Sequence, residues 1–519
     1  MNKNKNASAP NALEAINTLL EYKRERRELE VRLEREREIW KSVYNNSNGS
    51  ASWIFNSIVN KHADIIDSIP TCICLPREEK DEKDAEMLSK IIPVICERSE
   101  FDACYSDNAW EKLKYGVAIY GVFWNNFKER GLGDIDIKQI KLENIYWENG
   151  VSDIQDSKNL FITALCDVEM LEAAYPHFKY KEHREDEQKL LSALTHSSSI
   201  DGKCLVVDWY YKKFDKNGSP ILHYCKLVGS CVLYSSEQDD DMTGGWYEHG
   251  QYPVVVDIMY PEEDSAVGFG LISIAEDAQN YVNRIDDNIL GYSDWASRVR
   301  FWAKRSLGVN EKDFLDLEKR IVEVEGDIDE EKLKQIEIGT LDSSVIDVKK
   351  MKIEEIKELT GSRDVSQGGI TGGVTAASAI SILKESGAKS SRDGIAQSYR
   401  AYVKIIILVI ELIRQFYDYP RIFRILGDSG EREYLSFSAN RIRGDGSKKP
   451  YFDIEVSAIT KSPTESKQKN EFAKDLYEKG AFKVQNAEET LMMLELMDFD
   501  GIEKLKATLR KTLQTEKRS

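Results

Sequence analysis

One amphipathic pattern, running from Leu271 to Arg298, limits the folds open to this chain. Apolar side chains recur there at helical spacing, and acids and amides fill most of the positions between them. The apolar stripe consists of Leu271, Ile274, Ala278, Tyr281, Ile285 and Tyr292, widened by Ala275, Val282 and Ile289. A helix over this range is about 42 Å long. A narrow stripe on such a helix predicts packing against other helices, within one chain or between chains.

The segments after this helix repeat the helical theme around a small insert. Residues 299–347 alternate short strands with charged turns, and a second helix follows from Val348 to Leu359. Five glycines then fall between Gly361 and Gly373, which predicts a loop whose backbone can approach another molecule closely. The pattern next predicts a very long helix from Thr375 to Asp418, apolar nearly all round in its second half and therefore buried.

The N-terminal half predicts a mixed α+β domain. We expect one exposed helix over residues 12–44, laced with Glu–Arg pairs, and further helices from Trp53 to Ile66 and from Glu82 to Tyr115. Residues 115–260 are mainly strands, with a hairpin turn at Asp215–Gly218. The expected strands there are 117–124, 134–140, 205–214, 220–228 and 252–260, with a short helix at 167–175. Strands return at 421–426, 434–437 and 451–458, and the tail from 466 to 511 is helical.

Composition restricts the compartment and the partners. The net charge of −18 argues against a protein that grips nucleic acid, because binding needs cations to neutralise phosphates; it does not exclude DNA sliding past. The longest apolar run, Ile405 to Ile410, is far too short to cross a membrane, and the N-terminus has no apolar core after its lysines. Eight scattered cysteines without a CxxC pair are typical of free thiols in the reducing cytoplasm.

No pattern in the sequence requires an enzyme. A P-loop needs a lysine and a preceding strand, whereas Gly368–Thr375 has no lysine and follows a helix. The paired acids Asp134 and Asp136 lie on one strand face, where solvated carboxylates are the commoner case. No HExxH, Ser-His-Asp or Cys-His arrangement stands out, and metal-ligand spacings are missing. We therefore expect no catalytic residue, no cofactor and no metal.

The order of these elements, together with local sequence, resembles the portal proteins of tailed double-stranded DNA bacteriophages. The joint order carries the resemblance, since none of the local patterns is a catalytic signature. The segments that look like family sequence are Gly116–Trp124, Tyr247–Val255, Phe269–Gly270, Asp277–Asn283, Leu359–Gly368, Thr375–Ile380 and Lys389–Arg392.

The resemblance implies a domain plan with the family's names. It consists of an N-terminal helix and α+β wing (1–270), a stem helix (271–298), a small α/β clip (299–347), a second stem helix (348–361), a tunnel loop (362–374), a long tunnel helix with a return to the wing (375–460), and a helical crown and tail (461–519).

The resemblance also implies a function and partners. We expect a ring, usually of twelve subunits, at one capsid vertex of the virion, made in the bacterial cytoplasm and serving as the channel for genome packaging and ejection. Its expected partners are the terminase large subunit, the major capsid and scaffolding proteins, a head-completion or connector protein, and double-stranded DNA in transient, non-specific contact. No membrane is involved. An acidic channel wall repels DNA and so lowers sliding friction.

Three sets of residues follow as candidates. The tunnel loop would touch DNA through Arg363, Gln367, Gly368, Gly369, Gly372 and Gly373. The clip would dock the terminase through Glu323, Glu325, Asp327 and Asp329. The stem would pack the ring through Leu271, Ile274, Tyr281, Ile285 and Ile289. Two other classes stay open, namely a capsid scaffolding protein and a nucleic-acid-processing enzyme of head morphogenesis. The mass of the assembly distinguishes them from a ring.

Overall fold

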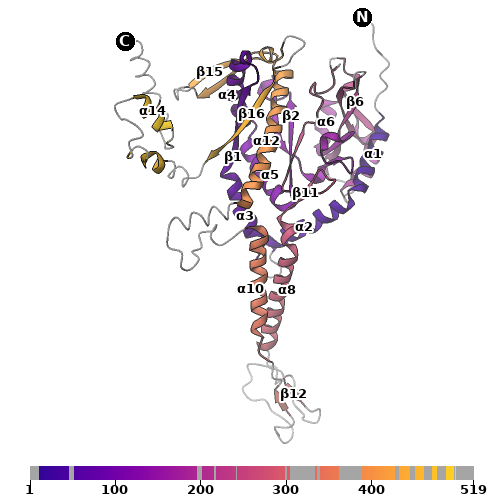
Figure 1. Cartoon of the computed structure of the whole chain (residues 1–519). Coiled ribbons are helices and arrows are strands. Elements are labelled where there is room, and N and C mark those ends of the chain that lie inside the picture. Colours follow the sequence, from indigo (N-terminus) through magenta and orange to yellow (C-terminus); the bar gives the residue numbers. More distant parts are fainter. Residues whose placement is uncertain are drawn as a thin grey trace. The chain divides into compact units, whose positions relative to one another are not determined.

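The fold is taken from a computed structural model, which divides into two compact units. Unit 1 comprises Met1–Glu38, Ile58–Ser273 and Asp364–Ser519, and unit 2 comprises Ile39–Ser57 and Ile274–Arg363. The structure describes residues 11–45, 52–195, 201–215, 218–240, 242, 244–297, 301–303, 312, 333–335, 339–361, 389–426, 432–444, 450–460, 470–475, 478, 487–495, 497 and 506. The mixture of helices and antiparallel strands confirms the predicted α+β class (Figure 1).

The first predicted helix is two helices, and it is not simply exposed. Helix α1 (Ala12–Glu25) and helix α2 (Arg27–Asn45) meet at Arg26, whose backbone leaves the helical region. The Arg26 guanidinium donates to the carbonyl oxygen of Leu142 at 3.3 Å and lies 4.0 Å above the ring of Tyr146. These contacts hold the chain at the break. One face of α1 is buried rather than exposed to solvent. The prediction of a single solvated helix was therefore wrong.

The largest sheet among the described residues is antiparallel, lies in unit 1 and has five strands in the order β4-β5-β6-β7-β8. The predicted hairpin is confirmed, since β6 and β7 pair in register from Val207/Leu227 to Phe214/Pro220. The strands are β4 (Ile145–Trp147), β5 (Asn159–Asp167), β6 (Lys203–Phe214), β7 (Pro220–Val228) and β8 (Cys231–Ser235). Helix α6 (Val168–Ala174), also predicted, and helix α7 (Tyr180–Leu194), which was not predicted, connect β5 to β6.

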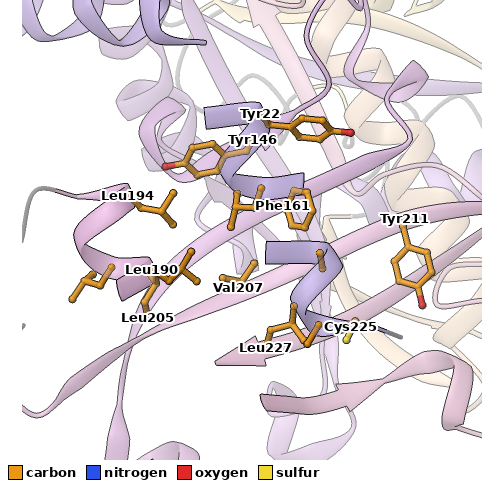
Figure 2. Close-up of a cluster of buried hydrophobic side chains, with 14 residues drawn as sticks. Tyr22, Tyr146, Phe161, Leu190, Leu194, Leu205, Val207, Tyr211, Cys225 and Leu227 are labelled. Carbon is orange, nitrogen blue, oxygen red and sulfur yellow. The ribbon is translucent and has the colours of Figure 1, made fainter. Parts of the chain in front are cut away.

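The two faces of this sheet bury different cores. On one face, α1 and α7 cover a cluster that includes Phe161, Leu190 and Val207. Figure 2 shows Leu190 of α7 next to Leu205 of β6 within this cluster. On the opposite face, Phe178 and Leu171 lie against Cys204, Val206 and Val228. Burial on both faces explains why the strands are apolar runs rather than alternating ones.

A second, three-stranded sheet in the order β3-β2-β9 packs against two helices, α5 and α12. Its strands are β2 (Val117–Asn125), β3 (Asp134–Gln139) and β9 (Val254–Ile258). The predicted helix before β2 is divided into α4 (Glu82–Arg98) and α5 (Phe101–Tyr115), because Glu100 adopts the left-handed conformation between them with φ 53°. Helix α12 (Lys389–Phe416) is the described part of the predicted long helix, and its second half is largely buried, as expected.

The remaining elements form two-stranded ribbons and short helices. Strand β1 (Ser68–Pro76), which was not predicted, pairs with β16 (Phe452–Thr460), and β14 (Arg421–Leu426) pairs with β15 (Arg432–Phe437). The others are α3 (Trp53–Ile66), α8 (Leu271–Ser297), α10 (Ser343–Thr360), α14 (Ala487–Glu495), β10 (Tyr260–Pro261), β11 (Gly268–Phe269), β12 (Phe301–Ala303) and β13 (Leu333–Gln335). Single 3₁₀ turns occupy 79–81, 129–131, 142–144, 154–156, 236–238 and 439–441.

The acids of β3 are buried, which corrects the expectation of a solvated strand face. Asp134 accepts a hydrogen bond from the Tyr417 hydroxyl at 2.6 Å, and Asp136 forms ion pairs with Lys128 at 2.9 Å and Lys138 at 2.6 Å. Burial favours the neutral form of Asp136, but the hydrogen bonds from Lys138 and Lys128 outweigh it and lower its pKa. These carboxylates therefore connect strands and helices within unit 1.

Candidate functional site

Helices α8 and α10 run side by side in unit 2, and α8 carries the predicted ring-packing residues (Figure 1). Helix α8 is described from Leu271 to Ser297, and the predicted last residue, Arg298, lies outside the described residues. Helix α10 begins at Ser343, earlier than expected, because Asp342 caps it by accepting a hydrogen bond from the Ser344 amide at 3.0 Å. It ends at Thr360 and is capped by Gly361, whose φ of 68° is the left-handed conformation that glycine adopts most easily.

Polar and cation–π contacts fix the register of the two helices. Lys349 of α10 forms an ion pair with Asp286 of α8. The Lys352 ammonium lies 5.2 Å from the centre of the Tyr281 ring, within the range of a cation–π contact. The Tyr292 hydroxyl donates to the carbonyl oxygen of Gly339, in the segment before α10. These contacts bring a lysine-bearing face of α10 onto an acidic face of α8.

Unit 2 is completed by the segment Ile39–Ser57. The side-chain oxygen of Gln279 on α8 accepts a hydrogen bond from the Trp53 amide at 2.9 Å. On α10, the buried Thr360 hydroxyl lies 3.0 Å from the Ser57 hydroxyl and 2.8 Å from the Ile356 carbonyl oxygen. Both helices are thus tied to the start of α3 by buried polar contacts, which position them as one body.

The predicted stem residues fall into two groups. Leu271 is fully buried in the single chain, and it belongs to unit 1. Ile274, Ile285 and Ile289 are half-buried, and Tyr281 is exposed. The stripe read from the sequence is therefore only partly covered within one chain.

The sequence interpretation missed a larger set of uncovered apolar side chains on both helices. Seven of them are between 43% and 70% exposed, namely Tyr281, Leu290, Trp295, Ile346, Val348, Met351 and Leu359. Only Tyr281 was among the candidates. Their signal was available, since large apolar residues on a helix whose remaining positions are charged indicate a contact surface.

The long helix α12 is anchored in unit 1 by a buried ion pair. The Lys112 ammonium lies 2.6 Å from an Asp257 carboxylate oxygen, and both side chains are 1% exposed. The same ammonium donates to the Gly394 carbonyl oxygen and the Ser398 hydroxyl, each at 2.8 Å, on α12. The Ser398 hydroxyl in turn donates to the other Asp257 oxygen at 2.7 Å. Every partner of this pair is satisfied inside the fold, as a buried charge requires.

A second polar cluster holds α12 closer to its described start. The Ser391 hydroxyl donates to Asp64 of α3 at 2.8 Å, and the buried Lys61 ammonium lies 3.5 Å from that hydroxyl. Burial lowers the pKa of Lys61, against the opposing effect of the nearby Asp64 carboxylate. Together the two clusters fix the part of α12 nearest to the glycine-rich segment.

Two of the three candidate sets lie outside the described residues. They are the clip acids Glu323, Glu325, Asp327 and Asp329, and the tunnel-loop residues Arg363, Gln367, Gly368, Gly369, Gly372 and Gly373. Their assignments stay predictions. Within the described ranges, no group of three or more His, Cys, Asp or Glu side chains could hold a metal ion. The same ranges contain no helix that is both long and apolar enough to span a membrane.

Comparison with known proteins identifies the family. A family model described as "Phage P22-like portal protein" matches residues 54–283 and 316–519. No curated protein matches the chain. Among solved structures, a chain of the "Virion of native gene transfer agent (GTA) particle" is similar at 11% identity and a TM-score of 0.40, over 85% of this chain and 89% of that one. Because the family model matches well over half of the sequence, the chain belongs to the phage P22-like portal protein family, a family of structural, non-enzymatic components of the phage virion.

Proposed function

We propose that copies of this chain form a closed ring at one capsid vertex, twelve in the family pattern, and that DNA enters and leaves the capsid through the ring. The observation that carries the proposal is the set of seven uncovered apolar side chains on α8 and α10. Side chains of this size lose favourable burial when they face water. They occur on two helices of one unit, and we propose that a neighbouring copy of the same chain covers them.

Ring closure needs two different faces on each subunit, because a heterologous contact repeats in one direction around an axis. The α8–α10 pair offers such faces. Helix α8 carries the exposed acids Asp277, Asp287 and Asp294, whereas α10 exposes Lys350, which lies 3.7 Å from the exposed Asp347 of the same helix. We propose that the α8 face of one copy meets the α10 face of the next. The uncovered apolar side chains of the two faces then supply most of the affinity.

The channel role rests on charge and on the anchoring of α12. A net charge of −18 for each copy gives a ring whose summed field repels phosphate, which prevents tight adhesion of DNA. The Lys112–Asp257 cluster fixes the helix that follows the glycine-rich segment. We propose that this helix carries the segment toward the channel axis, and that the clip docks the terminase and later a connector protein.

Mass photometry of the full chain tests the ring, with a matched pair of variants. Met351 on α10 is 70% exposed, and Met170 on α6 of unit 1 is 59% exposed. Met351→Asp should convert rings into monomers or small oligomers, because a charge in the contact cannot be solvated there. Met170→Asp should leave the ring mass unchanged. A wild-type protein that remains monomeric at micromolar concentration, or rings that persist in Met351→Asp, contradicts the proposal.

A further inference from the structure

We propose that Cys166 and Cys204 form a redox modification site, at which a small-molecule disulfide oxidant converts the two thiols into a cross-strand disulfide. Both cysteines are free in the structure, and they lie in β5 and β6 of the five-stranded sheet. Nothing in the portal role requires them, and the inference stands independently of how the subunits assemble.

Strand register places the two residues directly opposite each other. Cys166 and Cys204 are Cα partners in the antiparallel pairing of β5 with β6. The Val168 amide donates to the Gly202 carbonyl oxygen at 3.0 Å, two register steps further along. Because hydrogen-bonded and non-hydrogen-bonded pairs alternate, Cys166/Cys204 is a hydrogen-bonded pair with a Cα separation of about 5.5 Å. That separation lies inside the range of roughly 4.4–6.8 Å that disulfides span.

Both thiols point to the same face of the sheet, as directly opposed residues must. Cys204 is fully buried in the cluster with Leu171 and Phe178, and Cys166 packs against that cluster while remaining half-buried. Cys166 is therefore the sulfur that a dissolved oxidant reaches first. Cys225 of β7 faces the opposite core, so it cannot compete for either partner. Cys231 also packs against the cluster that contains Cys204. It is therefore the one other cysteine that could form a disulfide with Cys166 or Cys204, and the test must distinguish that product.

The reaction is a pair of thiol–disulfide exchanges. The Cys166 thiolate attacks oxidised glutathione, which forms a mixed disulfide and releases one glutathione thiolate. The Cys204 thiolate then attacks the Cys166 sulfur, forms the protein disulfide and releases the second glutathione thiolate. The protein loses two protons and two electrons, and oxidised glutathione takes them up to become two molecules of the reduced form. Burial raises the pKa of Cys166, and it raises that of Cys204 to about 12, so the reaction should accelerate as pH rises above neutral.

Such a disulfide should be easily reduced. Opposed side chains in an antiparallel pair have Cβ atoms about 4.5–5.5 Å apart, with hydrogen-bonded pairs at the wider end. A disulfide needs roughly 3.5–4.5 Å, so the two strands must approach each other and the bond is strained. The thiols would stay reduced in the cytoplasm, where the protein is made, and would oxidise after the virion leaves that compartment. The disulfide would then link the two ends of the segment between β5 and β6, which contains α6 and α7.

The experiment treats the full chain with oxidised glutathione at pH 7 and at pH 8.5, followed by alkylation of remaining thiols and tryptic mass spectrometry without reduction. Trypsin separates the two cysteines cleanly, into the peptides Asn159–Lys179 and Cys204–Lys212, each with a single cysteine. The expected product joins these two peptides, forms faster at pH 8.5, and disappears after dithiothreitol. A persistent glutathione adduct on Cys166 without the cross-linked peptide would overturn the proposal. A cross-link from either residue to Cys231 as the main product would overturn it as well.

Three single variants make the assignment specific. Cys166→Ala and Cys204→Ala should each abolish the cross-linked product, whereas Cys225→Ala should leave its yield within about two-fold of the wild type. Cys225 is the matched control because it is buried like Cys204, in the same sheet but on the opposite face. If Cys204→Ala does not fold, Cys166→Ala keeps the test decisive, since the half-buried Cys166 tolerates truncation better. A cross-link that forms only in urea and never in the folded chain would show that the native strands cannot approach, and would refute the inference.

Discussion

The Lys112 ammonium of α5 lies 2.6 Å from an Asp257 carboxylate oxygen of β9. The same ammonium donates to the Gly394 carbonyl oxygen and the Ser398 hydroxyl, and these contacts hold helix α12. Such a pair does not by itself make a protein more stable than a well-packed apolar pair would. Its effect is to specify position, because α12 can satisfy both charges only in one register. The stability of unit 1 and the placement of α12 should therefore depend together on these two residues.

Removing one member of this pair should be strongly destabilising. Lys112→Met leaves the Asp257 carboxylate buried without its cation, and we expect the free energy of unfolding to fall by about 3–5 kcal/mol. Thermal melting of the full chain, followed by circular dichroism, measures the change. Lys189→Met is the control, since the Lys189–Asp186 pair is exposed and contributes about 0–1 kcal/mol. Equal melting temperatures for the two variants would contradict the role of Lys112. The double change Lys112→Met with Asp257→Leu should recover part of the loss.

The sequence predicted this region only in part, and the reason is physical. It correctly indicated a buried helix over the described part of α12, because apolar residues surround that helix. It could not indicate that Lys112 is buried, since on a helix like α5 a lysine normally faces water. The division between α4 and α5 was also missed. No glycine or proline marks the left-handed residue Glu100, while the proline that is present, Pro93, lies inside α4.

Local signals were decisive where turn chemistry and periodicity agreed. The β6–β7 hairpin followed from the Asp215–Gly218 turn, and α8 followed from its stripe almost to the residue. Strand β5 was missed although the turn-forming residues Asp156 and Ser157 precede it, and α7 was missed because its apolar residues lie mainly in its last turn. The exposed side chains of α10 were missed for a different reason. Burial is a property of the packed pair of helices, and periodicity alone does not give it.

The paired lysines at Asp136 predict a specific loss of stability in acid. Hydrogen bonds from Lys138 and Lys128 hold the pKa of Asp136 below the ordinary value of 3.8. A carboxyl whose pKa is lowered by folding contributes stability above its unfolded pKa, and this contribution disappears as the pH falls through the folded pKa. Asp136→Asn should therefore lower the melting temperature at pH 7, and this difference should shrink as the pH falls below 3.8 and through the lower folded pKa. A difference between the two proteins that stays constant over the whole pH range would contradict the ion-pair assignment.

The acids of the predicted clip should contribute to motor docking. Reversing Glu323, Glu325, Asp327 and Asp329 to lysine changes the charge of this surface by eight units per chain, since each replacement adds two. Binding to the terminase large subunit, measured by pull-down at low salt, should weaken at least ten-fold, while ring mass stays the same. Replacing the same acids by their amides is the matched control for size, and it should weaken binding less. Unchanged binding in the lysine variant would remove these residues from the docking surface.

The glycine-rich segment should matter for genome handling and not for assembly. Glycine loses more backbone freedom on ordering than any other residue, so five glycines between Gly361 and Gly373 are an expensive way to join two helices. A connector needs one or two of them, as the left-handed Gly361 at the end of α10 illustrates. We therefore expect the remaining glycines to serve close, transient contact with DNA in the channel, assisted by Arg363.

Deleting Gln367–Gly372 should leave the ring mass unchanged, because the uncovered side chains of α8 and α10 are untouched. The same deletion should reduce packaged or retained DNA at least ten-fold. Replacing the same six residues by a glycine–serine sequence of equal length should restore much of that loss if backbone freedom is what matters. Nuclease-protected DNA per particle is the measurement, and normal packaging by the deletion variant would exclude this segment from the channel.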